Sequence, residues 1–203
     1  MGRRRRQVFI NVPFDEKYER LYVALIAGLV GLGANPRCSL EVPTTRDRLR
    51  RVFNLLRSCD LSIHDLCRVE LSRDKPRCPR FNMSFEAGLA VALFLSGSRK
   101  PWHILEKDRY RLLKSLSDLK GYEVNAHEGT PKGMLGVLLD IFPWDPHQPD
   151  PDALHRMYQS LRKASSQIKK ENGNDLFRPR SFRVLRYAAE DIAKRVRHET
   201  SSY

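Results

Sequence analysis

One carboxylate, Glu86, stands among small and apolar residues in segment 80–90. The segment is typical of the first turns of a buried helix, and Asn82 or Ser84 could cap its start. A carboxylate on a mostly buried helix is costly unless it has a partner or a chemical role. The alternative is a partly exposed acid in the first turn, where the helix dipole favours negative charge. Both interpretations fit this stretch, so the rest of the chain must decide between them.

Three further polar residues are expected near Glu86. Asn11 and Asp65 lie at the ends of short apolar segments that are typical of buried strands, and Asn82 lies in the Glu86 segment itself. Carboxylates in such a place suit glycosyl chemistry: one attacks or stabilises the anomeric carbon, and the other orients hydroxyls or protonates a leaving base. We therefore predict that Glu86 and Asp65 are catalytic and that Asn11 and Asn82 bind substrate. The structural alternatives are that Asp65 caps a turn and that Asn11 satisfies loop amides.

Basic residues are in excess, and the net charge of the chain is +13. A surface of this kind attracts polyanions or phosphorylated ligands. Arg77 and Arg80, just before the Glu86 segment, could hold a phosphate through charge and paired hydrogen bonds. The alternative is that the basic residues form solvated helix faces and a tail. Because charge alone supplies only non-specific affinity, we expect no specific recognition of nucleic acid.

Strands alternate with helices along the first two thirds of the chain, as in a parallel sheet covered on both faces. The expected strands are residues 7–12, 36–42, 59–66, 102–105 and 122–126, and the expected helices are 15–33, one capped by Thr44-Thr45, the Glu86 helix and 131–142. In such sheets a ligand binds beyond the carboxyl ends of the strands, where the strand order reverses. This rule brings Asn11, Asp65 and the Glu86 helix to one edge, where Glu41 could join them.

The last quarter of the chain has a different pattern. Residues 143–151 are rich in Pro and Asp, which is typical of a linker, and residues 152–203 have thin apolar stripes that predict a helical hairpin. A hairpin of this size cannot bury a core alone, so it must dock on the main domain or on another chain. The predicted organisation is therefore a basic tail (1–6), an α/β domain (7–142), a linker and a hairpin.

The four cysteines do not show the spacing of a zinc site and are expected to be reduced thiols. No apolar run is long enough to span a membrane, and the apolar segment of a signal peptide does not follow the first basic residues. We therefore predict a cytoplasmic protein that does not bind membranes, with no metal and no tightly bound cofactor.

Three blocks of the sequence resemble a known enzyme superfamily. They are residues 8–15 (VFINVPFD), 62–66 (SIHDL) and 81–90 (FNMSFEAGLA). Together they resemble the nucleoside 2-deoxyribosyltransferase-like proteins and their relatives, the Toll/interleukin-1 receptor (TIR) domains, and they are similar more closely to an uncharacterised bacterial group with the same blocks. The resemblance covers roughly residues 7–142. It implies a flavodoxin-like three-layer α/β sandwich with about five parallel strands, and cleavage or transfer at an N-glycosidic bond.

The resemblance also implies roles for single residues. The catalytic carboxylate of the family maps onto Glu86, its strand-end acid onto Asp65, and its first loop onto residues 11–14, which adds Pro13 and Phe14 to the substrate-binding set. The transferases usually place an acid and a Gly-Thr pair before the catalytic helix, where this chain has Arg80-Phe81-Asn82. From that basic residue we expect a phosphorylated ligand, either a nucleoside monophosphate or a dinucleotide such as NAD.

The sequence therefore predicts an N-glycosidase, hydrolase or transferase, that acts on nucleotides or NAD and forms a homo-oligomer. Similar domains imply a role in bacterial stress or antiphage defence. A second hypothesis is a non-catalytic nucleotide sensor that signals through its C-terminal helices. A third is a basic protein that docks on nucleic acid through its tail and hairpin.

Overall fold

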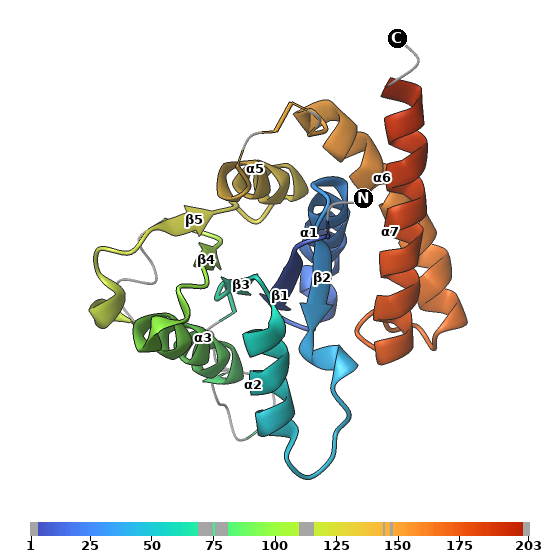
Figure 1. The fold of residues 1–203 in the computed structure, drawn as a ribbon. Helices are drawn as coiled ribbons and strands as arrows, with labels where there is room; N and C mark the ends of the chain where they lie inside the picture. The colour runs from blue at the N-terminus through green and yellow to red at the C-terminus, as the bar shows by residue number, and fades with distance from the viewer. Residues whose placement is uncertain are drawn as a thin grey trace. The chain divides into compact units, whose positions relative to one another are not determined.

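The computed structural model describes residues 4–68, 75, 81–109, 116–143, 145–146 and 148–200. For residues 198–200 it describes the backbone only. Its strands are β1 (Gln7–Asn11), β2 (Asn35–Cys38), β3 (Leu61–Asp65), β4 (Trp102–Glu106) and β5 (Val124–Ala126). They form one parallel sheet in the order β2-β1-β3-β4-β5, flanked by helices (Figure 1). This is the α/β class predicted from the sequence, and the strand order is that of flavodoxin-like sheets.

Helices and helical turns connect the strands and follow them. They are η1 (Glu16–Tyr18), α1 (Glu19–Gly31), η2 (Ser39–Glu41), α2 (Arg48–Ser58), α3 (Phe81–Leu93), the π-helical turn η3 (Phe94–Ser98), η4 (Ser117–Leu119), α5 (Pro131–Ile141), α6 (Pro151–Glu171) and α7 (Pro179–Thr200).

The chain folds into two compact units. The first contains Met1–Arg6, Phe14–Pro36 and Gly129–Tyr203, and the second contains Gln7–Pro13 and Arg37–Glu128. The predicted hairpin is present as α6 and α7, and it shares a unit with α1 and α5.

In the first unit, α1 is the central element. Every residue from Leu21 to Gly31 is buried, and α1 packs against α5, α6 and α7. A Cβ atom on Gly28 would lie 2.5 Å from Leu138 Cδ1, and one on Gly31 would lie 2.5 Å from Leu154 Cδ2. These two glycines therefore let α5 and α6 approach the backbone of α1 closely.

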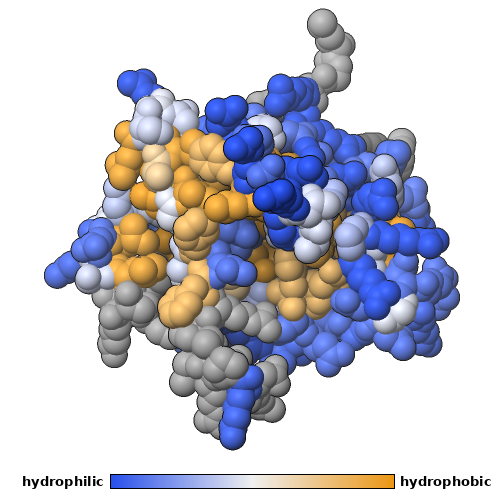
Figure 2. Space-filling model, turned by 90° about the horizontal axis from the view of Figure 1, so that it is seen from below, coloured by the Kyte–Doolittle hydropathy of each residue, from blue (hydrophilic) through white to orange (hydrophobic). Residues whose placement is uncertain are grey.

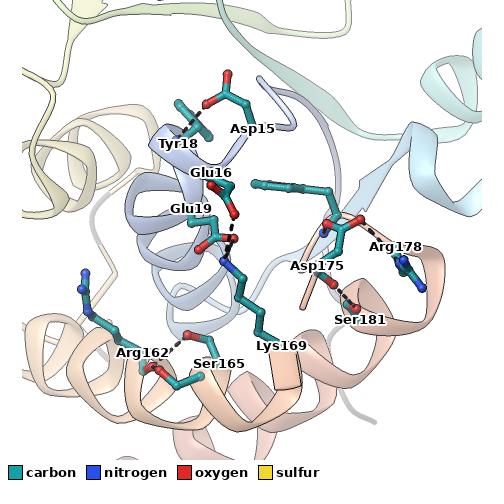
Figure 3. Close-up of polar contacts among 12 residues, drawn as sticks. Asp15, Glu16, Tyr18, Glu19, Arg162, Ser165, Lys169, Asp175, Arg178 and Ser181 are labelled. Atoms are coloured by element: carbon teal, nitrogen blue, oxygen red, sulfur yellow. Dashed lines mark hydrogen bonds and ion pairs between the residues drawn. The ribbon is translucent and has the colours of Figure 1, made fainter. Parts of the chain in front are cut away.

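Polar contacts at the helix ends complete the first unit (Figure 3). Lys169 Nζ lies 2.7 Å from Glu19 Oε1 and 3.6 Å from Glu16 Oε1, so α6 is tied to the start of α1. The Asp15 side chain accepts a hydrogen bond from the Tyr18 N–H and caps η1. Ion pairs near the surface contribute little free energy. Apolar packing around α1 therefore provides most of the stability of this unit.

The second unit holds α2 and α3 on the sheet through two apolar clusters. The clusters comprise Phe9, Val42, Val52, Leu56, Cys59 and Ala90, and Leu66, Met83, Ala87 and Ile104. The buried side of α3 therefore consists of Met83, Ala87 and Ala90, which recur at helical spacing. Glu86 lies next to this stripe on the helix surface.

The second predicted strand is shorter than expected. It was expected over residues 36–42 but ends at Cys38. The Glu41 carboxylate accepts the Cys38 backbone N–H at 3.0 Å and, through both oxygens, the single N–H of Arg37 Nε at 2.9 Å. This closes the turn η2, so Glu41 has a structural role there.

Two expected helix caps are wrong. Helix α2 begins at Arg48, after Asp47, whose left-handed φ is 67°, and not at Thr44-Thr45. Helix α3 begins at Phe81, so Asn82 and Ser84 both lie within the helix. Short runs of Thr, Asp and Asn offer several possible caps, and only tertiary packing selects one of them.

Candidate functional site

The strand order reverses between β1 and β3, which are neighbours although β2 separates them in sequence. Their carboxyl ends bring Asn11 next to His64, with Asp65 following directly. Helix α3 packs against both strands. This is the place at which doubly wound sheets bind their ligands.

Asn11 holds three elements together. Its Nδ2 lies 2.8 Å from the Met83 carbonyl oxygen of α3 and 3.1 Å from His64 Nδ1 of β3. The Nε2 of His64 lies 2.9 Å from Ser62 Oγ, so Nδ1 accepts from Asn11 while the Nε2–H donates to Ser62. Burial lowers the pKa of His64 to about 3 and keeps the ring neutral. Both Nδ2 hydrogens of Asn11 are thus engaged within the protein.

Glu86 is the titratable group whose environment favours a chemical role. It is partly buried on α3, one turn after the Met83 carbonyl that Asn11 binds. Burial raises the pKa of Glu86 from 4.5 to about 7, while the charge of Arg48 acts in the opposite direction. The side chain is therefore about half ionised at neutral pH. Carboxylates tuned in this way are found at functional sites more often than elsewhere.

Arg48 is a site residue that the sequence analysis missed. Its guanidinium donates to the carbonyl oxygens of Val42, at 2.6 Å, and Ser39, at 3.2 Å. These bonds fix a positive charge within electrostatic reach of Glu86. In the sequence, Arg48 is one of four arginines within residues 46–51, and nothing local distinguishes it from the other three.

Asp65 lies at the predicted edge of the sheet but is enclosed, with no exposed surface. Its Oδ1 accepts the backbone N–H of Cys67 at 2.9 Å, and its Oδ2 lies 3.0 Å from Nε2 of the fully buried His127. The carboxylate therefore fixes the backbone that follows β3, and because it has no exposed surface it does not face a ligand. His127 was not singled out from the sequence, because it lies sixty-two residues away from Asp65.

The other predicted residues lie in different surroundings. Pro13 is buried, and Asn82 is exposed in the first turn of α3. Phe14 belongs to the first unit, where its ring packs against Tyr22 and Phe177. Arg77 and Arg80 lie outside the described residues. Asn11, by contrast, bonds to Met83, one turn before Glu86, and to His64, the residue before Asp65.

Helix α3 and the turn η3 that follows it also present apolar side chains to solvent. Phe81 and Leu95 are about two thirds exposed, and Phe85 is 54% exposed. An apolar area interrupted by hydrophilic side chains lies on the face drawn in Figure 2. Exposed apolar patches of this kind commonly mark interaction sites. The expected homo-oligomer stays a prediction.

The charge of Arg48 gives a direct test of the geometry around Glu86. We expect Arg48→Gln to raise the pKa of Glu86 above about 7, because the substitution removes the positive charge that partly offsets the effect of burial on this pKa. The measurement is an NMR titration of the Glu86 side-chain carboxyl carbon in labelled protein. Arg50→Gln is the matched control, since Arg50 is exposed on the same helix. An unchanged Glu86 pKa in Arg48→Gln would contradict the electrostatic interaction between the two side chains.

Comparison with known proteins adds no further constraint. No protein family matches the chain, and neither a curated protein nor a solved structure does. The resemblance to nucleoside 2-deoxyribosyltransferase-like proteins thus stays a prediction. Within the described part of the chain, none of the helices combines the length and apolar character needed to cross a lipid bilayer.

Proposed function

We propose that the chain is an N-glycosidase, hydrolase or transferase, that acts on a nucleotide or on NAD, with Glu86 as the catalytic carboxylate. The observation that carries this proposal is the position of Glu86. It is a partly buried carboxyl with a pKa of about 7, on a helix that packs at the reversal point of the sheet. The three sequence blocks that resemble nucleoside 2-deoxyribosyltransferase-like proteins support it independently.

In the proposed reaction, the C1′–N bond breaks and its electron pair leaves with the base. Ionised Glu86 attacks C1′ or stabilises the positive charge that develops there. Water or a second acceptor then takes the sugar. If the substrate is NAD, the positively charged nicotinamide leaves as a neutral base and needs no proton from the protein. A single carboxylate then suffices, which agrees with the enclosure of Asp65.

The surrounding residues have supporting roles in this proposal. Arg48 limits the pKa of Glu86 and adds positive charge that favours a phosphorylated ligand. Asn11 positions the first turn of α3 through the Met83 carbonyl and offers its Oδ1 to the sugar. Asp65 positions the chain after β3. Arg77 and Arg80 remain the predicted phosphate ligands.

The first test is a chromatographic assay for free base, with NAD, nucleoside monophosphates and nucleosides as substrates. A group with a pKa of about 7 is about 10% ionised at pH 6 and about 90% ionised at pH 8. We therefore expect base release to be roughly tenfold faster at pH 8 than at pH 6. Release that is equally fast at both values would contradict the role of ionised Glu86.

The alternative function is a nucleotide sensor, and it is favoured by the enclosure of Asp65, one of the two carboxylates predicted to be catalytic. The same assay separates the two functions when thermal unfolding is measured with each compound. An intact ligand that raises the unfolding temperature without base release would support the sensor and contradict the glycosidase. Neither release nor a shift would contradict both.

A further inference from the structure

A second cluster of reactive side chains lies at the carboxyl edge of the sheet, apart from Glu86. The Asp65 carboxylate, the Cys67 thiol and the His127 imidazole place one ligand atom each within 4.8 Å of one another. Asp65 and His127 have no exposed surface, and Cys67 is 8% exposed. Thiolate, imidazole and carboxylate are the three ligand types that hold zinc in proteins.

The sheet brings these residues together from distant parts of the chain. The register pairs Asp65 with Leu105 and Glu106 with Ala126, so β3, β4 and β5 end side by side. The backbone N–H of His127 donates to the backbone carbonyl oxygen of Glu106 at 3.0 Å. His127 thus follows β5 at the edge where Asp65 ends β3. No sequence motif records this arrangement, because its parts are about sixty residues apart.

A further acidic residue is buried near this cluster. Glu106, at the end of β4, is only 1% exposed, and its charge, like that of Asp65, acts on the Cys67 thiol, while the charge of Arg68 acts on it in the opposite direction. Burial of a carboxylate is costly unless opposite charge offsets it. A divalent cation bound to Asp65 would add such charge and would also engage the thiol.

We propose that Asp65, Cys67 and His127 bind a zinc ion. The thiol favours zinc over magnesium or calcium, which prefer oxygen ligands alone. Binding releases the thiol proton and replaces the contact between Asp65 and His127. That contact is 3.0 Å long, and ligand atoms about 2.1 Å from a tetrahedral ion lie about 3.4 Å apart, so only a small opening is needed.

The ion has a structural role in this proposal, because its ligands are buried and come from protein side chains. It joins the end of β3 to the end of β5 and fixes the chain that leaves β3. The proposal is independent of the N-glycosidase function, since no step at Glu86 uses the ion. It replaces the expectation, based on cysteine spacing, that the chain binds no zinc.

Metal content of the full-length protein tests the proposal. Protein purified without chelator, incubated with excess zinc and desalted should carry about one zinc ion per chain by mass spectrometry of the elements. Cys67→Ala should lose most of it, whereas Cys59→Ala should retain it, because Cys59 is buried in the separate apolar cluster of the same unit. Circular dichroism confirms that each variant is folded.

Cobalt substitution gives a second, independent readout. Protein loaded with Co²⁺ should show the absorption of a cobalt–thiolate bond, and Cys67→Ala should lose that band. Chelation of the ion should lower the unfolding temperature of the parent protein. Folded parent protein that takes up neither metal would overturn the proposal, as would equal zinc content in the parent and in Cys67→Ala.

Discussion

At pH 8, Glu86→Gln should be more stable to unfolding than the parent protein. The folded protein holds the Glu86 proton up to about pH 7, whereas the unfolded chain releases it near 4.5. Between these values the unfolded state binds fewer protons, so the stability of the parent falls as pH rises. The shift corresponds to at most about 3 kcal/mol, and Gln, which never ionises, avoids this loss.

Urea unfolding of the parent and of Glu86→Gln at pH 4.5 and pH 8 measures this effect. The advantage of the variant should be present at pH 8 and absent at pH 4.5. Glu41→Gln is the matched control and should lose stability at pH 8, because Glu41 binds Arg37 and the Cys38 N–H. If Glu86→Gln were less stable than the parent at pH 8, Glu86 would be a structural residue.

The second large effect concerns Asp65. Asp65→Ala should lower the free energy of unfolding by about 3–5 kcal/mol, because it removes the carboxylate that lies 3.0 Å from the buried His127 imidazole and that accepts the Cys67 backbone N–H. Asp65→Asn should lose less, since its amide oxygen can still accept the Cys67 N–H. These measurements are made with chelator present, so that they report the contact with His127 and not a bound metal.

A double-mutant cycle with His127→Ala completes this test. The loss in the double variant should be clearly smaller than the sum of the two single losses, because both remove the same contact. If the two single losses of unfolding free energy simply added in the double variant, the contact between Asp65 and His127 would be contradicted. Base release by folded Asp65→Asn then shows whether the charge of Asp65 matters to the reaction; we expect a small effect, since the carboxylate is enclosed.

The sequence predicted the fold well where local signals and long-range packing agree. The apolar residues at helical spacing in α1 and Pro131 at the start of α5 are strong signals, and both elements form as expected. The strand after α1 was predicted too long, because the Glu41 side chain closes a turn that hydrophobicity does not reveal.

The candidate site could be predicted only in part. Asn11 and Glu86 were placed by their positions at a strand end and on an apolar helix. Arg48 was missed because its role depends on two carbonyl groups of the preceding loop. His127 was missed because it meets Asp65 only through the pairing of three strands. Contacts of this kind follow from sheet register, which one sequence does not encode locally.

Base release by the parent and by Glu86→Gln at pH 8 tests the central claim most directly. The assay uses NAD and the nucleotide panel, with unfolding measured in parallel to confirm that the variant is folded. We predict release by the parent and at least about a hundredfold loss in Glu86→Gln, as expected when a group that acts directly at the reacting bond is removed. Equal release by both proteins would contradict it.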